Sequence, residues 1–442
     1  MNTNAILGLG VAAVILIIAS LYALIAPPSS SADQRPMLDI LPSSITMLSV
    51  HHDAHTIEHV ERTDSGWLYS RQGSPSRWPV NTNNINGALR LLADLHAPRN
   101  SNASKEATGP HVELTLSDSS TRTIQFGEAR IGGSVAMRVV DGPSSFVDDS
   151  IRAMFFQPGP SAWRAPQALP GVNADVSRIH LTRGNESITL SRVANSWQLT
   201  EPIAYRSDQQ RVTELLRALI GLGCETFLMS DDEIANAREL VSSPDLVIET
   251  TTVQRVAEND GQIDTQRNTR TLLVRADGPA GRVLAHNLEH DTLMTLDSDS
   301  LDSLAAFDAL TLIDPTACGS LHVDVAGIEL DRPGAYWRFI RSIDGWSTDQ
   351  GPADADGSAL DMLIGFLTDA PAEDIRIAPM PTLDTWCDIT LLDLSQQPLE
   401  TITLGIDTQG VMHAAVPTLD GQIVVLTYNQ SIPSLLEQFL TR

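Results

Sequence analysis

One pattern occurs three times along this chain and constrains its fold more than any other feature. Each copy has alternating apolar residues, then Trp67, Trp197 or Trp346, a Pro-containing turn, an amphipathic helix, and further alternating segments ending in a short helix. Alternation with a period of two is typical of half-buried strands, and a 3.6-residue period is typical of a helix with one buried stripe. The repetition therefore predicts three tandem α+β modules, each an antiparallel sheet with covering helices.

The apolar helix residues set the expected correspondence between the copies. Leu92, Leu216 and Ile364 are taken as equivalent, at offsets of 216 − 92 = 124 and 364 − 216 = 148. The tryptophans are 197 − 67 = 130 and 346 − 197 = 149 apart, so the first copy carries 130 − 124 = 6 extra residues around positions 71–77. The expected helix residues, each set preceded by a polar residue, are Asn84 with Ala88, Leu91, Leu92 and Leu95; Asp208 with Val212, Leu215, Leu216 and Leu219; and Asp356 with Leu360, Leu363, Ile364 and Leu367.

Local chemistry supports these assignments. An Asp four residues before an apolar stripe suits a helix N-terminal cap. Each Trp is expected to pack where the helix covers the sheet, because large aromatic side chains are usually buried. The residues expected on half-buried strands are Leu48, Val50, Ile57, Val60, Val112, Leu114 and Leu116 in the first copy, Ile179, Leu181, Ile188, Leu190 and Val193 in the second, and Val323, Val325, Ile328, Leu330, Ile389 and Leu391 in the third.

An uncharged apolar run precedes the repeats. Residues 5–26 contain no charged side chain, and about 20 apolar residues suffice for a helix to cross a bilayer. A cleaved signal peptide and a buried core helix are the alternatives. The run is longer than a signal-peptide core, and no basic residue precedes it. We expect a retained single transmembrane anchor at residues 1–26, whose orientation the flanking charges leave undecided.

Breaker-rich segments suggest the domain boundaries. A Pro/Ser-rich tether is expected at 27–43 and a Pro-rich linker at 158–173. The expected modules are 44–157, 174–314 and 320–442.

Composition limits the partners. With 55 acidic and 29 basic residues the formal net charge is −26, which argues against nucleic acid because its binders need clustered Lys and Arg. Three cysteines without metal-ligand spacing imply no disulfide framework.

The segment WQLTEPIAYRSDQQRVTELLRAL, Trp197 to Leu219, resembles the bacterial family of domain of unknown function 4340. That family's pattern is a Trp, a turn with Pro, an Asp cap and a V-x-x-L-L-x-x-L helix. Residues 112–140 resemble its later strands, with Gly127 at a strand end. The resemblance implies a single-anchor protein of the bacterial inner membrane with its body outside the cytoplasm. It also implies kinship with auxiliary components of gliding-motility or ABC-2 type export systems, and it carries over no catalytic residue.

Two H-x-x-E-H motifs are the strongest enzyme-like signals: His55, Glu58 and His59, and His286, Glu289 and His290. On a helix this spacing places two zinc ligands on one face. Both motifs adjoin strand-like residues, and on a strand the histidines would be roughly 13 Å apart, too far for one ion. The polar turn with His51, His52, Asp53 and His55 is a second candidate metal site.

Two acidic stretches partly resemble calcium loops: Asp354, Asp356 and Asp361, and Asp297, Asp299 and Asp302. Neither has both the Gly and the bidentate Glu that a calcium loop needs, and Asp356 and Asp299 are expected to be helix caps. The polar insertion at 253–270 is expected to project as a hairpin arm or flexible loop. It is either a partner contact or a tolerated surface insertion.

The leading functional hypothesis is a non-enzymatic, membrane-anchored extracytoplasmic scaffold or auxiliary subunit that contacts an envelope complex such as an ABC-type exporter. We assign no catalytic, cofactor-binding or metal-binding residue. The alternatives are a metal-dependent hydrolase that uses the His clusters, and a module that binds glycan or peptide in surface grooves.

Overall fold

The structure is a computed structural model that describes residues 34–53, 55–64, 66–98, 103–156, 163–257, 263–351 and 357–429. The fold is mixed α+β, with antiparallel sheets and few helices among these residues, as the sequence predicted. The chain divides into two compact units between Ala165 and Pro166. The predicted anchor at 5–26 lies outside the described residues, within which no helix is long and apolar enough to span a membrane.

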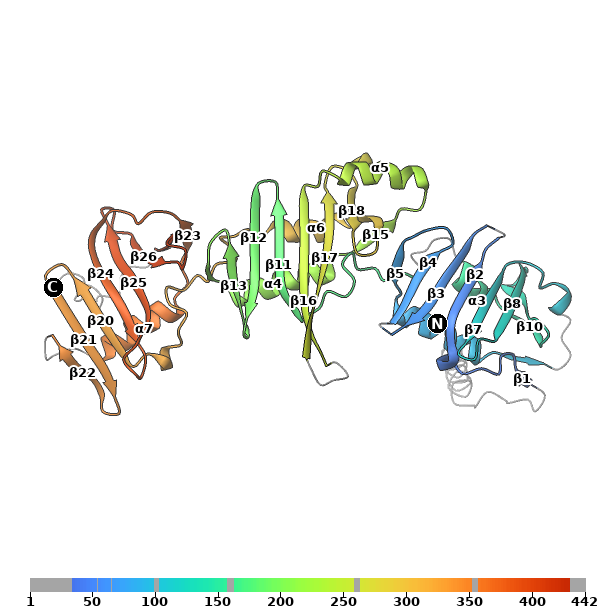
Figure 1. Cartoon of the computed structure of the whole chain (residues 1–442), viewed down its shortest axis with the longest axis horizontal. Helices are drawn as coiled ribbons and strands as arrows, with labels where there is room; N and C mark the ends of the chain where they lie inside the picture. The colour runs from blue at the N-terminus through green and yellow to red at the C-terminus, as the bar shows by residue number, and fades with distance from the viewer. Residues whose placement is uncertain are drawn as a thin grey trace, which may run out of the picture. The chain divides into compact units, whose positions relative to one another are not determined.

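The first unit contains one large antiparallel sheet (Figure 1). A small second sheet pairs β1 (Gln34–Pro36) with β6 (His96–Pro98), and the helices are α2 (Thr82–Ala93) and α3 (Asp149–Phe156), with 3₁₀ turns at Pro42–Ser44 and Ala103–Lys105. The large sheet has the spatial order β10 (Ser144–Asp148), β9 (Ser134–Val139), β8 (Thr121–Ala129), β7 (His111–Leu116), β2 (Ile45–His51), β3 (Ile57–Thr63), β4 (Gly66–Arg71), β5 (Arg77–Pro79).

The second unit contains two further antiparallel sheets. The helices that accompany the first of them are α4 (Gln209–Gly221), α5 (Asp231–Val241) and α6 (Ser298–Ala305). This sheet has the order β14 (Tyr205–Arg206), β13 (Ser196–Glu201), β12 (Glu186–Val193), β11 (Val176–Arg183), β16 (Leu246–Ala257), β17 (Ile263–Arg275), β18 (Val283–Asn287), β19 (Thr292–Leu296), β15 (Cys224–Phe227).

The last sheet is accompanied by α7 (Gly357–Asp369) and by a 3₁₀ turn at His322–Asp324. Its order is β22 (Gly345–Gln350), β21 (Ala335–Ser342), β20 (Gly327–Arg332), β24 (Leu383–Leu392), β25 (Pro398–Asp407), β26 (Met412–Pro417), β27 (Ile423–Tyr428), β23 (Asp374–Ile377).

One strand order is common to the three large sheets. In each, three consecutive strands form a meander, and the second strand after the covering helix (β7, β16 or β24) returns beside the first of the three. Three consecutive strands then continue the sheet outward. This shared topology fits tandem related modules.

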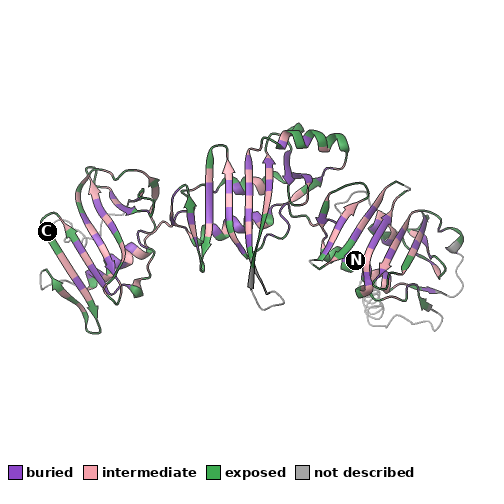
Figure 2. Cartoon of the chain, in the orientation of Figure 1, coloured by how far each residue is buried: buried purple, intermediate pink, exposed green. Residues whose placement is uncertain are grey.

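Burial alternates along most strands (Figure 2), whereas β18 and β19 of the second sheet are buried at every residue. In the first sheet, Leu48 and Val50 of β2 and Val112 and Leu114 of β7 are fully buried. They pack in one core with the helix stripe of α2. The opposite face carries the intervening polar residues, because successive side chains of a strand point to opposite sides.

Helix α4 matches its prediction. Asp208 caps it, because its Oδ1 accepts hydrogen bonds from the backbone N–H groups of Gln210 and Arg211 at 2.8 and 3.0 Å. The expected stripe of α4 is buried. In α7 the expected Leu360, Leu363, Ile364 and Leu367 are likewise buried, while the expected cap Asp356 lies outside the described residues.

The register predicted for the first helix was wrong. Asn81, not Asn84, caps α2, and the buried stripe is Ile85, Ala88, Leu89 and Leu92. Leu216 therefore corresponds to Leu89. The first copy carries three extra residues between Trp and cap rather than six (81 − 67 = 14 against 208 − 197 = 11).

The tryptophans lie where they were expected, beside the helices. Trp67 and Trp197 are buried. Trp346 is half-buried and donates from Nε1 to Asp361 of α7 at 3.0 Å. Val193 lies in β12 as predicted but is half-exposed. The strand positions predicted for Val323 and Val325 were wrong, because both precede β20: Val323 is exposed in a 3₁₀ turn and Val325 is buried directly after it.

The described parts of the predicted tether and linker are packed. Met37 and Leu38, which follow β1, belong to the core of the first unit. At the linker, Trp163 belongs to the same core. Pro166, three residues later, already belongs to the second unit, and its carbonyl accepts a hydrogen bond from the backbone N–H of Cys224 at 2.6 Å.

Within the second unit, Arg206 joins β14 to residues of the last sheet. Its guanidinium hydrogen-bonds to Glu400 of β25 and to the Thr316 carbonyl at 2.9 Å, and its Nε lies 3.4 Å from Asp314. The backbone N–H of Gly319 donates to the other oxygen of Glu400 at 2.9 Å. A Cβ on Gly319 would overlap the side chain of Arg206, so a larger residue here would displace that side chain.

We predict that Gly319→Ala lowers the free energy of unfolding of the second unit by about 1–3 kcal/mol, because the methyl group displaces Arg206 from its partners. Differential scanning calorimetry of the full chain in mild detergent measures this. The matched control is Gly365→Ala in α7, where a Cβ meets nothing within 4 Å and a gain of about 0.4–1 kcal/mol is expected. Equal effects of the two variants would contradict the role given to Arg206.

Candidate functional site

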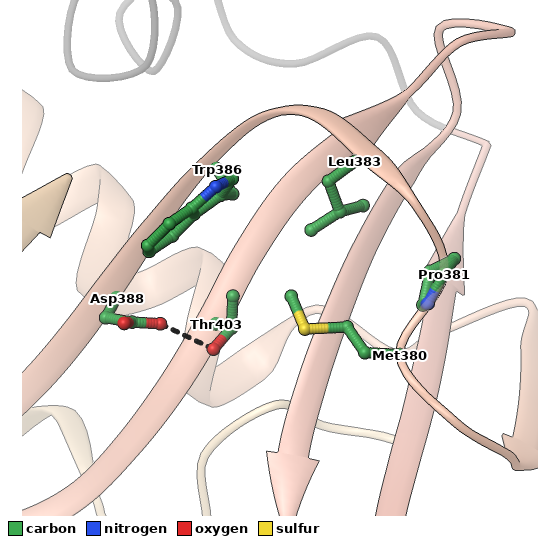
Figure 3. A pocket seen from close by; sticks show the side chains of 6 residues that line it. All are labelled: Met380, Pro381, Leu383, Trp386, Asp388 and Thr403. Carbon is green, nitrogen blue, oxygen red and sulfur yellow. Dashed lines mark hydrogen bonds between the residues drawn. The ribbon is translucent and has the colours of Figure 1, made fainter. Parts of the chain in front are cut away.

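An open pocket of about 320 Å³ lies on the last sheet (Figure 3). Trp386 and Asp388 contribute from β24 and Thr403 contributes from β25. Met380, Pro381 and Leu383 line it from the segment that leads into β24. Trp386 and Met380 are each 37% exposed, so both side chains are partly accessible from solvent.

Strand alternation explains why these side chains are accessible. Cys387, Ile389 and Leu391 of β24 are buried. Trp386 and Asp388 therefore point to the opposite face of the sheet. Asp388 is held there by Thr403, which lies directly across from it and donates from Oγ1 at 2.5 Å.

Gly405 keeps space open beside the tryptophan. It pairs with Trp386 across β24 and β25. A Cβ on Gly405 would lie 2.5 Å from Cδ1 of Leu383 and 3.1 Å from Cβ of Trp386. Any larger residue would therefore push against the side chains of this pocket.

The first H-x-x-E-H motif does not bring its three residues together. His59 lies on β3, as expected for a strand, and its Nδ1 is 2.9 Å from the Ser49 hydroxyl. Glu58 points to the buried face, where Tyr69 donates to it at 3.0 Å and His52 Nε2 lies at 3.3 Å. His55 is exposed in the preceding turn.

In the second motif Glu289 and His290 lie close together, with His290 Nε2 3.9 Å from the Glu289 carboxylate, but His286 has a different partner. His286 on β18 lies 2.9 Å from Asp291, which also pairs with Arg238 of α5 at 2.8 Å. Glu289 pairs with Arg270 of β17 at 3.2 Å. Across the described ranges, no three His, Cys, Asp or Glu side chains are grouped so that they could hold a metal ion.

The predicted histidine cluster is replaced by a different one on the exposed face of the first sheet. His51 of β2 pairs across the strands with His111 of β7, and their rings stack with centroids 4.1 Å apart. Glu113 lies 3.7 Å from His51 Nε2. Asp53 instead closes the turn by accepting from the backbone N–H groups of His55 and Thr56. The motif spacing could not indicate His111, because only strand pairing brings it to His51.

The acidic stretches have structural roles where they are described. Asp297, not Asp299 as expected, is the residue before α6, and it accepts a hydrogen bond from Ser300 at 2.8 Å. Asp361 accepts from Trp346 and lies 3.4 Å from Arg341. Asp354 and Asp356 lie outside the described residues.

The insertion at 253–270 is a hairpin arm, one of the two forms expected. Strands β16 and β17 pair in continuous register from Leu246 and Val274 to Ala257 and Ile263. The neighbouring strands stop earlier, since β11 pairs with β16 only as far as Thr252 and β18 pairs with β17 only from Leu272 onward. The pairs from Val253 outward thus form a two-stranded ribbon.

The stacked histidines generate a pH-dependent contribution to stability. Burial lowers the pKa of His51 below its ordinary value of 6.5, and the adjacent His111 lowers this pKa further, while Glu113 opposes the shift. The folded chain thus binds fewer protons at His51 than the unfolded chain. This contribution is fully present above pH 6.5 and is lost as the pH falls below that value.

We predict that His111→Gln raises the pKa of His51 and flattens the fall in melting temperature of the first unit between about pH 7 and pH 5. Calorimetry at a series of pH values measures this. The control is His55→Gln, which removes an exposed imidazole from the turn that follows β2 and should leave the pH dependence of the melting temperature unchanged. A steeper fall in His111→Gln would contradict the repulsion between the two rings.

The chain was compared with known proteins. The family model described as domain of unknown function (DUF4340) matches residues 67–240 and again residues 197–384. The matches begin at Trp67 and Trp197, the tryptophans that occupy equivalent positions in the first two copies, and together they span more than half of the chain. No curated protein matches the chain. The chain therefore belongs to the DUF4340 family.

Proposed function

We propose that this protein is a non-enzymatic, membrane-anchored scaffold of the bacterial envelope. Residues 5–26 hold it in the inner membrane, and three related modules, each a sheet with covering helices, form a body outside the cytoplasm that binds another envelope protein. The uncharged apolar run supports the anchor. The resemblance described from the sequence makes components of ABC-type exporters the first partners to look for.

The observation that carries the proposal is the ribbon of β16 and β17. Beyond Thr252 and Asn268 the two strands pair only with each other in the described part of the chain. Among the described residues no third strand pairs with this part of either strand, and a two-stranded ribbon alone is only marginally stable in water. Such an arm is suited to pairing with an extended segment of a partner.

The placement of the chemically reactive side chains also supports a binding role. The imidazoles of both H-x-x-E-H motifs have neighbours that stabilise the fold, since His59 contacts Ser49 and His286 contacts Asp291. Burial raises the pKa of the Cys318 and Cys387 thiols to about 12, which disfavours the nucleophilic thiolate.

The test replaces the ribbon with a tight turn. Val253 and Arg267 are cross-strand partners, so residues 254–266 can be exchanged for Asn-Gly, a sequence that favours a two-residue hairpin turn. We expect the full-length tagged chain to copurify with a stoichiometric membrane protein in mild detergent. The shortened chain should lose this partner and keep a melting temperature within a few degrees of the original.

The matched control exchanges Pro333-Gly334, the turn between β20 and β21, for Asn-Gly, and this variant should retain the partner. Elemental analysis of the same samples tests the metal-dependent alternative. Full retention of the partner by the shortened chain would show that the ribbon is not needed for binding. A purified chain with no partner and with about one equivalent of zinc would contradict the scaffold function itself.

A further inference from the structure

We propose that the pocket around Trp386 binds an arginine side chain of the partner protein. This inference rests on the proposed scaffold function and specifies a second contact, on the exposed face of the last sheet. It follows from three properties of the pocket: an uncovered aromatic ring, apolar walls, and carboxylates without a basic partner.

The aromatic ring is available to a cation. Elsewhere in the chain, arginines lie over aromatic rings, as Arg332 does over Trp337 at 4.7 Å and Arg341 over Trp346 at 5.6 Å. No described cation lies over the ring of Trp386. Tryptophan is the best aromatic partner for a guanidinium, and a desolvated pair contributes about 2 kcal/mol. Met380, Pro381 and Leu383 would cover the aliphatic stem of the bound side chain.

The charge of this face favours a cation. Asp388 and Asp331 of β20 are directly opposite each other across the strands. Like charges in this position destabilise a sheet, and a bound cation would relieve their repulsion. Within the described residues, neither carboxylate forms an ion pair with a basic side chain.

The nearby arginines of this sheet have other partners. Arg338 lies 3.5 Å from Glu329 and 3.7 Å from Asp349, and Arg341 lies 3.4 Å from Asp361. Arg376 pairs with Asp374. Arg332, next to Asp331 on β20, lies over Trp337. Within the described residues no basic side chain forms an ion pair with Asp388, so this carboxylate can accept a cation from another molecule.

Arginine fits these features better than lysine does. Its planar guanidinium can stack on an indole and donate hydrogen bonds to a carboxylate at the same time. Thr403 already donates to Oδ1 of Asp388 and holds that carboxylate in place, so less freedom is lost when the cation binds.

The test uses ¹⁹F NMR of the full chain labelled with 5-fluorotryptophan, in mild detergent and at about 0.15 M salt to screen long-range attraction. The seven tryptophans give resolvable signals, and Trp386→Phe identifies the signal of interest by its loss. The probe is Nα-acetyl-L-arginine amide. We expect the Trp386 signal to shift saturably while the other signals stay in place.

Two comparisons establish the chemistry. Nα-acetyl-L-citrulline amide has the same shape without the charge and should produce no saturable shift. Asp388→Asn should weaken arginine binding at least about tenfold, and Asp331→Asn should weaken it less. The matched control Asp344→Asn removes an exposed charge from the turn between β21 and β22 of the same sheet and should leave the affinity unchanged.

Several results would overturn the proposal. These are an unmoved Trp386 signal, equal shifts with arginine and citrulline amides, or equal losses in Asp388→Asn and Asp344→Asn. A saturable shift with N-acetylglucosamine and none with arginine amide would instead assign the pocket to a sugar. Any of these results could accompany a copurifying partner, so the pocket can fail while the scaffold function stands.

Discussion

One-sided burial of antiparallel strands is the constraint on which the rest of this structure depends. Each large sheet buries alternate residues beneath a helix, and the residues between them are left on the other face. The stacked histidines of the first sheet and the pocket of the last sheet both lie on such faces. The apolar stripe of each helix must face the buried side of its sheet. The stripe of α2, for example, packs in one core with β2, β3, β4 and β7. The second sheet departs from this division at β18 and β19, which are buried throughout and from which Leu284 and Leu293 pack in a separate core with α5.

The sequence was sufficient to predict the α+β class and the strand–Trp–helix order of each copy, because both depend on local periodicity and capping, whereas helix α5 of the second copy was not predicted. Asp208 and the stripe of α4 are an example, since one cap and one apolar phase agree there. The first helix shows the limit of this reasoning. Asn81 and Asn84 can both cap a helix. Ala88 and Leu92 form an apolar stripe either with Leu91 and Leu95 or with Ile85 and Leu89. Only packing against the sheet determines which of these two stripes is buried.

The pocket could not be predicted from local patterns, because strand pairing assembles it. Thr403 and Gly405 reach Asp388 and Trp386 through the register of β24 and β25, and no spacing rule encodes that register. One signal was available in the sequence. Trp386 lies an odd number of residues before the buried Ile389 and Leu391. Because side chains of a strand alternate between its two faces, this spacing places the large aromatic side chain on the exposed face. The H-x-x-E-H motifs show the opposite case, in which a conspicuous pattern is divided between a strand and the adjoining turn.

The central claim is that the ribbon of β16 and β17 binds another envelope protein. Site-specific photo-crosslinking in cells tests it most directly, with p-benzoylphenylalanine in place of Val253, which is exposed where the ribbon begins. The reference position is Ile343, which is fully exposed in the turn between β21 and β22. The account predicts one discrete adduct with a membrane protein from position 253 and none from position 343. Absence of any adduct at 253, or the same adducts from both positions, would contradict it.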